Sequence, residues 1–275
     1  MFLLNISIAI PDSSLSDDLT KLDKSRKISD IARACAIFKV RTIYIYKDGN
    51  EKNDQELLVT ILKYLDTPPF LRRALFPRID TLKYAGVLHP LKIPSHLMSS
   101  DSKKIKTNDV RDGVVISSKG KKFVNFAINQ LIPYYGKANV GKRITAQFKK
   151  GYPELIIKEI TREEISQYWG FTVKERSDLF SLILSWPGNT ILTSRKGKII
   201  SQSLIKKYID SKKPILVVYG STNKDIHEIL GSRIKQIQNS KTLNFFPDQG
   251  TETVRLEEAI LGTLSILNLY HVDHH

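Results

Sequence analysis

The chain has 275 residues, 41% of them apolar and 26% charged, which excludes a disordered chain and suits one large or two modest globular domains. Its single cysteine, Cys35, excludes an intrachain disulfide, and no run approaches the roughly 20 apolar residues of a membrane span, so we expect a cytoplasmic protein without membrane segments. Lys and Arg outnumber Asp and Glu by 43 to 28, a net charge of +15. A folded chain this basic most often binds nucleic acid, although a merely basic soluble surface is the alternative.

The first 65 residues alternate between β-prone and helical patterns. Leu3 to Ile10 is predicted to be a strand, and apolar residues from Ile28 to Phe38 keep helical spacing. Thr42 to Tyr46 is β-rich, and Leu57 to Leu65 is again amphipathic and helical. This β-α-β-α order is typical of a parallel sheet covered by helices.

The alternation ends at Thr67, where a segment rich in proline and arginine begins. Its sequence P-P-F-L-R-R-A-L-F-P-R carries Arg72, Arg73 and Arg78 within seven residues. Clustered arginines suit phosphate binding, so we predict that these three contact RNA.

The segment Asp109 to Ile160 has an all-β pattern, with short β-prone runs separated by glycine or proline turns. Its length and spacing predict a small barrel of the OB type, which binds single strands through a basic groove and stacking aromatic residues. The alternative is a set of structural aromatic residues beside a solvated basic face. The predicted RNA-binding residues of this segment are Tyr134, Tyr135, Lys137, Lys142 and Lys149.

Helical and β patterns then return. Phe171 to Leu184 is predicted to be helical, Asn189 to Thr193 a strand and Gln202 to Asp210 a helix. Pro214 to Tyr219 is an unbroken apolar run, as in a strand buried on both faces, and Gly220 follows it directly. The sequence therefore predicts an α/β domain interrupted by a β insert.

In the stretch from Lys241 to Leu267, a strand end, a turn and a helix are predicted to follow one another directly. Pro247 and Asp248-Gln249-Gly250 end an apolar run, and an apolar stripe at helical spacing begins after Thr253. Thr251 or Thr253 could cap this helix. A glycine turn before a helix presents free backbone N–H groups to a ligand, although it is also an ordinary strand-loop-helix of an α/β core.

Two features look like ligand sites but lack the required residues. The run Gly136 to Lys142 matches a phosphate loop until its next position, where Arg143 replaces the Ser or Thr, and a β pattern follows instead of a helix. His89 and His96 have no neighbouring Cys or acidic ligands. We therefore predict a hairpin-type loop at the first position and no metal site in the protein.

Four stretches together resemble the SPOUT-class RNA methyltransferases that carry an inserted OB-like barrel. They are Ile31–Phe38 (I-A-R-A-C-A-I-F), Pro69–Pro77 (P-F-L-R-R-A-L-F-P), Tyr168–Val173 (Y-W-G-F-T-V) and Asp248–Ile260 (D-Q-G-T-E-T-V-R-L-E-E-A-I). They occur in the family's order, and the resemblance covers nearly the whole chain. The resemblance implies an α/β SPOUT trefoil-knot domain over residues 1–88 and 161–275, a barrel insert over 89–160, and a homodimer.

The resemblance also implies S-adenosylmethionine as cofactor, held by three loops. The matching positions here are Leu192, Thr193 and Ser194 in the first loop, Val218, Tyr219 and Gly220 in the second, and Phe245, Phe246, Gly250, Thr251, Thr253 and Val254 in the third. Many relatives carry a Gly-x-Glu type sequence after the strand of the second loop, whereas this sequence has Gly220-Ser221-Thr222-Asn223-Lys224 there. The acidic cofactor contact of those relatives is therefore not carried over.

The function implied by the resemblance is methylation of RNA, and for the nearest eukaryotic relatives it is methylation of uridine N3 in large-subunit rRNA. Arg255 could stabilise negative charge on the pyrimidine oxygens, and Glu258 could orient Arg255 or accept the proton. A phosphate contact for Arg255 and a helix-start charge for Glu258 are the alternatives. A non-catalytic RNA-binding or ribosome-assembly factor, and methylation of another base, remain open as functions.

Overall fold

The computed structural model describes residues 5–49 and 52–272, and the chain forms two compact units. The α/β unit comprises the described residues of Met1–Lys63, Thr81–Pro90 and Phe171–His275, and the barrel unit comprises Tyr64–Asp80 and Leu91–Gly170. Packing thus joins residues 64–80 and 161–170 to the barrel. The functional domain ranges 1–88 with 161–275 and 89–160 stay a prediction.

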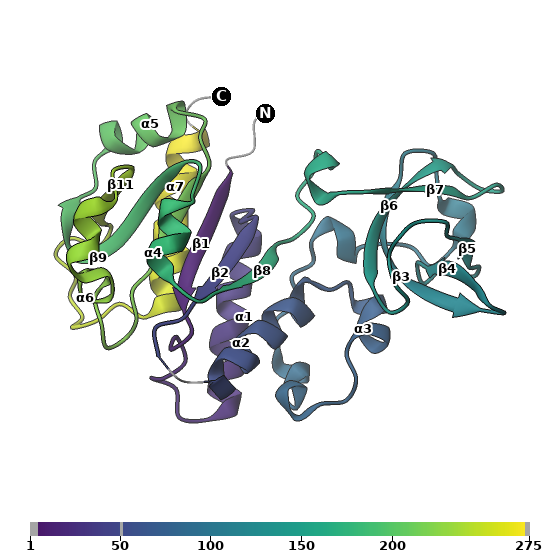
Figure 1. The fold of residues 1–275 in the computed structure, drawn as a ribbon, viewed down its shortest axis with the longest axis horizontal. Coiled ribbons are helices and arrows are strands. Elements are labelled where there is room, and N and C mark those ends of the chain that lie inside the picture. The colour runs from purple at the N-terminus through teal and green to yellow at the C-terminus, as the bar shows by residue number, and fades with distance from the viewer. Residues whose placement is uncertain (1–4, 50–51, 273–275) are drawn as a thin grey trace. The chain divides into compact units, whose positions relative to one another are not determined.

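The α/β unit is built on a parallel sheet, as the alternating pattern predicts (Figure 1). Within the described residues it has six strands in the order β11-β9-β10-β1-β2-β8. Their bounds are β1 (Ile6–Pro11), β2 (Thr42–Tyr46), β8 (Thr172–Arg176), β9 (Asn189–Ile199), β10 (Ile215–Val218) and β11 (Ser240–Asn244). The central strands β1 and β10 are buried along their whole length, which explains their unbroken apolar sequences.

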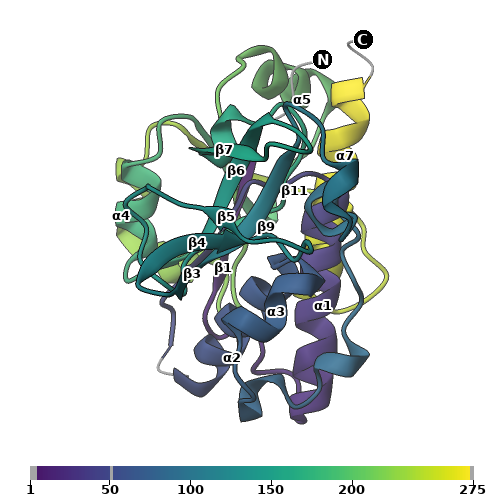
Figure 2. The same cartoon turned by 90° about the vertical axis from the view of Figure 1, so that its right-hand side faces the viewer.

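Helices cover both faces of this sheet. In Figure 2, α1 and α7 lie on one side of the strands and α4 lies on the other. The helices that contribute to this unit are α1 (Lys21–Ile37), α2 (Lys52–Asp66), α4 (Leu179–Leu184), α5 (Gln202–Asp210), α6 (Ile226–Leu230) and α7 (Leu256–Val272). Thr20 caps α1 by accepting a hydrogen bond from the Asp23 amide, and Ile28, Ile31 and Cys35 bury one face of that helix at the predicted spacing.

Two local predictions in this unit are wrong. The helix expected over Phe171 to Leu184 is a strand followed by a short helix, because residues 172–176 pair with β2 and Asp178 then caps α4. The last helix begins at Leu256 rather than near Thr253, so neither Thr251 nor Thr253 caps it.

The barrel unit, whose residues are all described, holds a nearly closed five-stranded antiparallel sheet in the order β5-β4-β3-β6-β7. Its strands are β3 (Val110–Ser118), β4 (Lys121–Asn125), β5 (Ile132–Pro133), β6 (Arg143–Lys150) and β7 (Ile156–Ile160), and α3 (Pro69–Leu75) packs with them. Ile144, Ala146 and Phe148 alternate into its core, as predicted for a half-buried strand. The loop from Gly136 to Lys142 joins β5 to β6.

A buried ionic network ties the barrel to the chain segments that enter and leave it. Arg143 on β6 donates to Asp66 Oδ2 at 2.9 Å and also to Asp112 on β3. Arg162 donates to the same Asp66 oxygen at 2.8 Å, and the Trp169 indole donates to Asp112 Oδ1 at 3.0 Å. Burial raises the pKa of Asp66, but the Arg162 and Arg143 guanidinium groups outweigh it and hold that pKa below its usual range.

Short 3₁₀ helices connect several elements: η1 (Asp80–Leu82), η2 (Ala85–Val87), η3 (Pro94–His96), η4 (Ser102–Lys104), η5 (Arg162–Glu164) and η6 (Gly231–Gln236). Among residues 5–49 and 52–272, no helix is both long and apolar enough to cross a membrane.

Candidate active site in the α/β unit

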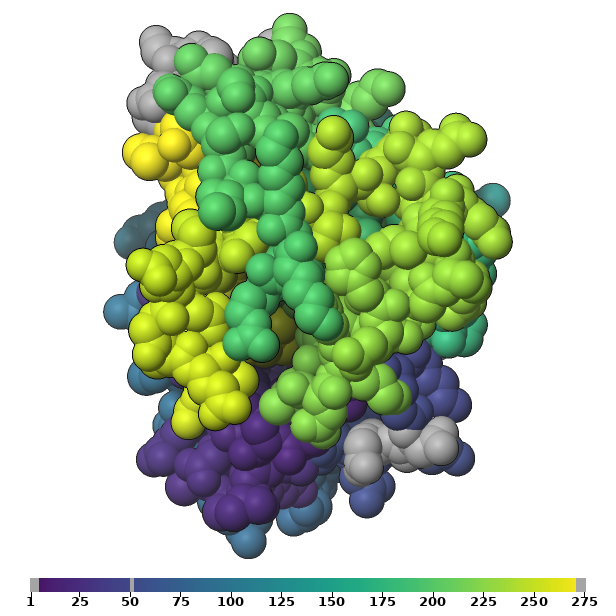
Figure 3. All heavy atoms as spheres, turned by 90° about the vertical axis from the view of Figure 1, so that its left-hand side faces the viewer, coloured from purple at the N-terminus to yellow at the C-terminus, as the bar shows by residue number. Residues whose placement is uncertain are grey.

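A cavity of about 390 Å³ opens at the carboxyl ends of β10 and β11, beside the middle of β9. Three chain segments supply most of its wall: residues 193–196, 219–225 and 243–256. Figure 3 shows it as a hollow between the green chain of β9 and the yellow chain before α7. Ligands of open parallel sheets bind at this edge, and the volume lies in the range of small-molecule sites.

The turn after β10 forms one wall of the cavity. The Ser221 amide donates to the Lys224 carbonyl at 3.1 Å, and the Lys224 amide donates back to Ser221 Oγ at 3.1 Å. A Cβ on Gly220 would lie 3.0 Å from the Lys224 carbonyl oxygen, so glycine suits the tight approach that closes this turn.

The second half of β9 lies against the chain that follows β11. Asn244 Nδ2 donates to the Arg195 carbonyl at 3.1 Å, and Arg195 Nη1 donates to the Glu252 carbonyl at 2.9 Å. A Cβ on Gly197 would lie 2.7 Å from the Leu243 backbone, so the two segments are in close contact. Through these bonds the first and third predicted cofactor loops are held beside each other.

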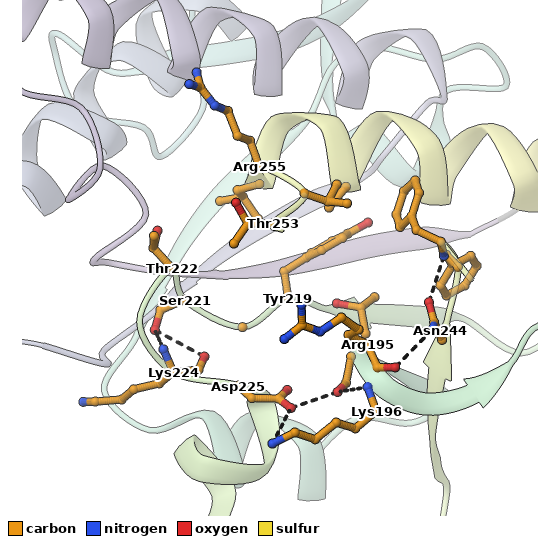
Figure 4. A pocket seen from close by; sticks show the side chains of 18 of the residues that line it. Arg195, Lys196, Tyr219, Ser221, Thr222, Lys224, Asp225, Asn244, Thr253 and Arg255 are labelled. Atoms are coloured by element: carbon orange, nitrogen blue, oxygen red, sulfur yellow. Dashed lines mark hydrogen bonds and ion pairs between the residues drawn. The ribbon is translucent and has the colours of Figure 1, made fainter. Parts of the chain in front are cut away.

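Charged side chains gather at one end of the cavity. Asp225 accepts a hydrogen bond from Ser194 Oγ at 3.0 Å, caps α6 through the Ile226 amide and lies 3.9 Å from Lys196 Nζ (Figure 4). Glu228 lines the same wall. These two carboxylates are not among the predicted site residues, although Asp225 directly before the helical run I-H-E-I-L has the sequence pattern of an N-cap.

Two buried hydroxyl groups line the other end of the cavity without a hydrogen-bond partner in the described part of the chain. Tyr219 is 2% exposed and follows β10, and Thr263 is 0% exposed and belongs to α7. Phe245 and Phe246 supply apolar surface to the same cavity. Tyr219 and both phenylalanines are among the predicted site residues, whereas Thr263 is not, because its position within an ordinary helical stripe carries no distinguishing signal.

The predicted cofactor residues fall into two groups. Eight of them line the cavity: Thr193, Ser194, Tyr219, Gly220, Phe245, Phe246, Thr253 and Val254. Leu192, Val218, Gly250 and Thr251 are not among its lining residues. Leu192 and Val218 are fully buried in the apolar core beneath the site, and a Cβ on Gly250 would meet nothing within 4 Å. The cofactor role of all twelve stays a prediction.

The two predicted catalytic residues lie at the start of α7. Arg255 lines the cavity with an exposed side chain that points away from Tyr219 and Asp225 in Figure 4. Glu258 Oε2 accepts a hydrogen bond from the Arg255 backbone amide at 2.9 Å, one helical turn away. This contact is that of a capping residue three positions into a helix.

A buried lysine lies beside the cavity among three carboxylates. Lys27 of α1, whose side chain is 4% exposed, pairs with Asp17, with Asp18 at 3.4 Å and with Glu257 of α7 at 3.7 Å. Burial raises the pKa of Glu257. The Lys27 ammonium lowers this pKa, and the Asp17 and Asp18 carboxylates raise it further. Asp17 also lines the cavity, so this cluster joins the loop after β1 to the first turn of α7.

The predicted RNA-binding residues of the barrel unit separate by exposure. Tyr135 is 96% exposed, and Lys137, Lys142 and Lys149 are exposed as well. Tyr134 is 6% exposed and lies in the barrel core, where its hydroxyl donates to Glu159 and accepts from the Ala138 amide. It therefore presents no free ring face for stacking.

The three predicted arginines of the barrel unit also differ. Arg72 is half-buried, donates to the Thr67 and Leu65 carbonyl groups and lies 4.4 Å from the Tyr64 ring centre. Arg73 and Arg78 are exposed. Only the latter two present their side chains freely to a phosphate.

In the described part of the chain no three His, Cys, Asp or Glu side chains are grouped as metal ligands would be. The residues that line the cavity offer charged groups, hydroxyl groups and apolar walls.

Comparison with known proteins gives a consistent result. An uncharacterised protein of Halobacterium salinarum is 29% identical over 96% of this chain and 98% of its own length. The 28S rRNA (uridine-N(3))-methyltransferase of Homo sapiens is 26% identical over 95% of this chain and 77% of its own length, and that of Mus musculus is 26% identical over 95% and 75%. Residues 5–267 match the model of a family described as "Putative RNA methyltransferase". The chain therefore belongs to this RNA methyltransferase family, as its motifs predict.

Proposed function

We propose that this protein is an S-adenosylmethionine-dependent methyltransferase that acts on N3 of a uridine in large-subunit rRNA. The observation that carries the proposal is the cavity at the carboxyl ends of β10 and β11, beside the middle of β9, in a chain of this family. Relatives named as 28S rRNA uridine-N3 methyltransferases support the choice of base and atom.

The chemistry of the cavity fits the proposed methyl donor. That molecule has an ammonium and a carboxylate at one end and an adenine at the other. Asp225 and Lys196 offer both signs of charge at one end of the cavity, and Phe245 and Phe246 offer apolar surface. Asp225 would take the place of the acidic residue that many relatives carry two positions after the second-loop glycine.

S-adenosylmethionine supplies a methyl group bound to a positively charged sulfur. The remaining task of the protein is to align a uridine with that carbon and to stabilise the uridine once N3 has lost its proton. We assign the second role to Arg255, whose guanidinium can donate to the pyrimidine oxygens as charge develops on them. Arg255 is exposed, and no partner of its guanidinium occurs among the described residues, which leaves it available to a substrate.

We further propose a trefoil knot, formed where the chain after β11 threads through the chain that follows β9. The contacts of Arg195 and Gly197 with residues 242–252 support this arrangement. The proposed homodimer is supported by exposed leucines on α7, Leu261 and Leu269, and light scattering tests it.

The barrel unit is proposed to bind RNA. Its exposed Tyr135 offers a ring for stacking, and the neighbouring Lys137 and Lys142 offer charge to phosphates. Exposed Arg73, Arg78 and Lys149 extend the set.

The proposal is tested by calorimetry and methyl transfer on the same protein. We expect the wild type to bind S-adenosylmethionine and to methylate rRNA, with the position read by mass spectrometry. Arg255→Ala should keep cofactor binding and lose about 100-fold in transfer, the usual cost of one electrostatic donor. Arg26→Ala is the matched control, since Arg26 is an exposed arginine on α1 outside the cavity.

The outcomes separate the alternatives. RNA binding without any cofactor affinity would favour a non-catalytic RNA-binding or ribosome-assembly factor. A methyl group found on another base would keep the cofactor and correct the target. Unchanged transfer by Arg255→Ala would remove Arg255 from the chemistry.

A further inference from the structure

The hydroxyl groups of Tyr219 and Thr263 are buried polar groups of the cavity that have no hydrogen-bond partner among residues 5–49 and 52–272. Buried hydroxyl groups normally form hydrogen bonds, because loss of water without a replacement is costly. Both side chains are more than nine-tenths buried and line the same cavity. Their missing partner is therefore to be sought in a ligand.

The two hydroxyl groups cannot satisfy each other. Each carries one proton to donate, so a bond between them would use one proton and leave the other without an acceptor. Burial raises the pKa of Tyr219, an effect that the nearby Thr263 hydroxyl opposes, so the phenol keeps its proton at neutral pH. At least one donor in this wall thus needs an acceptor from outside the described chain.

Rigid elements hold both side chains in place. The Tyr219 amide donates to the Ala9 carbonyl at 3.0 Å, and the Tyr219 carbonyl accepts from the Tyr46 hydroxyl at 2.6 Å. Thr263 lies within the seventeen-residue helix α7. A ligand that pairs with these hydroxyl groups meets donors that are already positioned.

The two ends of the cavity differ in polarity. The Tyr219 ring runs away from Asp225 and Lys224, and its hydroxyl points toward α7 (Figure 4). Phe245, Phe246 and Ala259 line the cavity as apolar groups, whereas Lys196 and Asp225 supply charge. A planar, uncharged ring with hydrogen-bonding atoms on its edge matches the hydroxyl end, and a zwitterion matches the charged end.

We propose that Tyr219 and Thr263 bind the adenine edge of the methyl donor through their hydroxyl groups and so select a purine at this end of the cavity. The inference rests on the proposed cofactor and adds the groups that recognise one part of it. Ring nitrogens of adenine accept from the hydroxyl protons, and its amino group can donate to the hydroxyl oxygens.

The test measures affinity for two probes that share adenine. S-adenosylhomocysteine carries the amino-acid end and 5′-methylthioadenosine lacks it. We expect Tyr219→Phe and Thr263→Val each to weaken both probes by about tenfold, the effect of one lost hydrogen bond in a dry site. The thermal midpoint of the ligand-free variants should stay level or rise, because each substitution removes an unpaired buried hydroxyl.

Tyr208→Phe is the matched control, since Tyr208 is a buried tyrosine of α5 that does not line the cavity. It should leave both affinities unchanged. Wild-type affinity in both variants, with the wild type binding, would overturn the contact and leave the cofactor proposal standing. Weakening confined to S-adenosylhomocysteine would place the hydroxyl groups on the amino-acid end and overturn the assignment to adenine. A wild type that binds neither probe would overturn the cofactor proposal and this contact together.

Discussion

Two sets of buried polar groups, one in each unit, have opposite surroundings. In the barrel unit, both oxygens of Asp66 and of Asp112 accept hydrogen bonds, from Arg143, Arg162, Thr145 and Trp169. In the cavity of the α/β unit, the Tyr219 and Thr263 hydroxyl groups have none in the described chain. The first set is complete without a ligand, and the second is not.

Whether a polar group has a partner within the chain distinguishes structural residues from ligand-binding residues more clearly than residue type does. Arginine and tyrosine occur in both settings, so neither identity alone predicts a role. Arg143 stabilises the fold because its partners are within the unit, whereas the Arg255 guanidinium has no partner among the described residues. Predictions that follow from this comparison concern groups of both kinds.

The largest effect is expected from the ionic network of the barrel unit. Asp66→Ala leaves the half-buried Arg162 without this carboxylate and leaves Arg143 with Asp112 alone, so the barrel unit should lose about 3–5 kcal/mol of unfolding free energy. The chain's two tryptophans, Trp169 and Trp186, lie in different units. Urea unfolding followed by Trp169 fluorescence in a Trp186→Phe background therefore reports on the barrel unit.

The matched control is Asp101→Ala, which removes an exposed cap of η4 in the same unit. It should cost about 1 kcal/mol or less, the usual value for a short cap. Equal losses in the two variants would show that the buried network contributes no more than a surface cap.

A second prediction concerns acid stability. The pKa of Asp66 is depressed in the folded state, so its contribution is fully present above the unfolded value, near 3.8, and is lost as the pH falls through the folded value. The unfolding free energy of the barrel unit should therefore fall as the pH drops below about 4 in the wild type, and Asp66→Asn should flatten this part of the profile. The measurement is the Trp169 urea midpoint across that range. Parallel profiles for the two proteins would contradict the assignment.

A smaller effect separates the two adjacent tyrosines of the barrel. Tyr135→Ala should weaken single-stranded RNA binding by about 1–3 kcal/mol, because its exposed ring can stack on a base. Tyr134→Phe keeps the buried ring but loses the bond to Glu159, so it should lower stability and leave RNA affinity unchanged. Fluorescence anisotropy at fixed salt measures the RNA affinity of both variants. Weaker binding by Tyr134→Phe and unchanged binding by Tyr135→Ala would place the RNA elsewhere.

Sequence patterns predicted much of the fold because its signals are local. Apolar runs identified β1 and β10, and alternation of Ile144, Ala146 and Phe148 identified β6. Thr172 to Arg176 was misassigned to a helix because pairing with β2, a contact distant in sequence, determines its conformation. The start of α7 was misplaced because Glu258, rather than either threonine, caps it.

The candidate site was predictable only where its loops carry motifs. Tyr219, Gly220, Phe245 and Phe246 came from the family resemblance and line the cavity. Asp17, Asp225 and Thr263 reach it through turns and helix packing, and no spacing in the sequence brings them together. Tyr134 and Tyr135 are adjacent and chemically alike, so their opposite exposure depends on which face of the barrel each occupies.

The smallest predicted effect distinguishes a cap from a catalytic base at Glu258. Its carboxylate accepts from the Arg255 amide, so it already has a structural partner, unlike the Arg255 guanidinium. Glu258→Ala should lower the unfolding free energy of the α/β unit by about 1 kcal/mol, whereas Glu258→Gln keeps an acceptor at this position and should retain most of it. Trp186 fluorescence in a Trp169→Phe background measures this unit. If Glu258 were the base, Glu258→Gln would instead keep stability and lose methyl transfer at all pH values, because an amide cannot accept the proton.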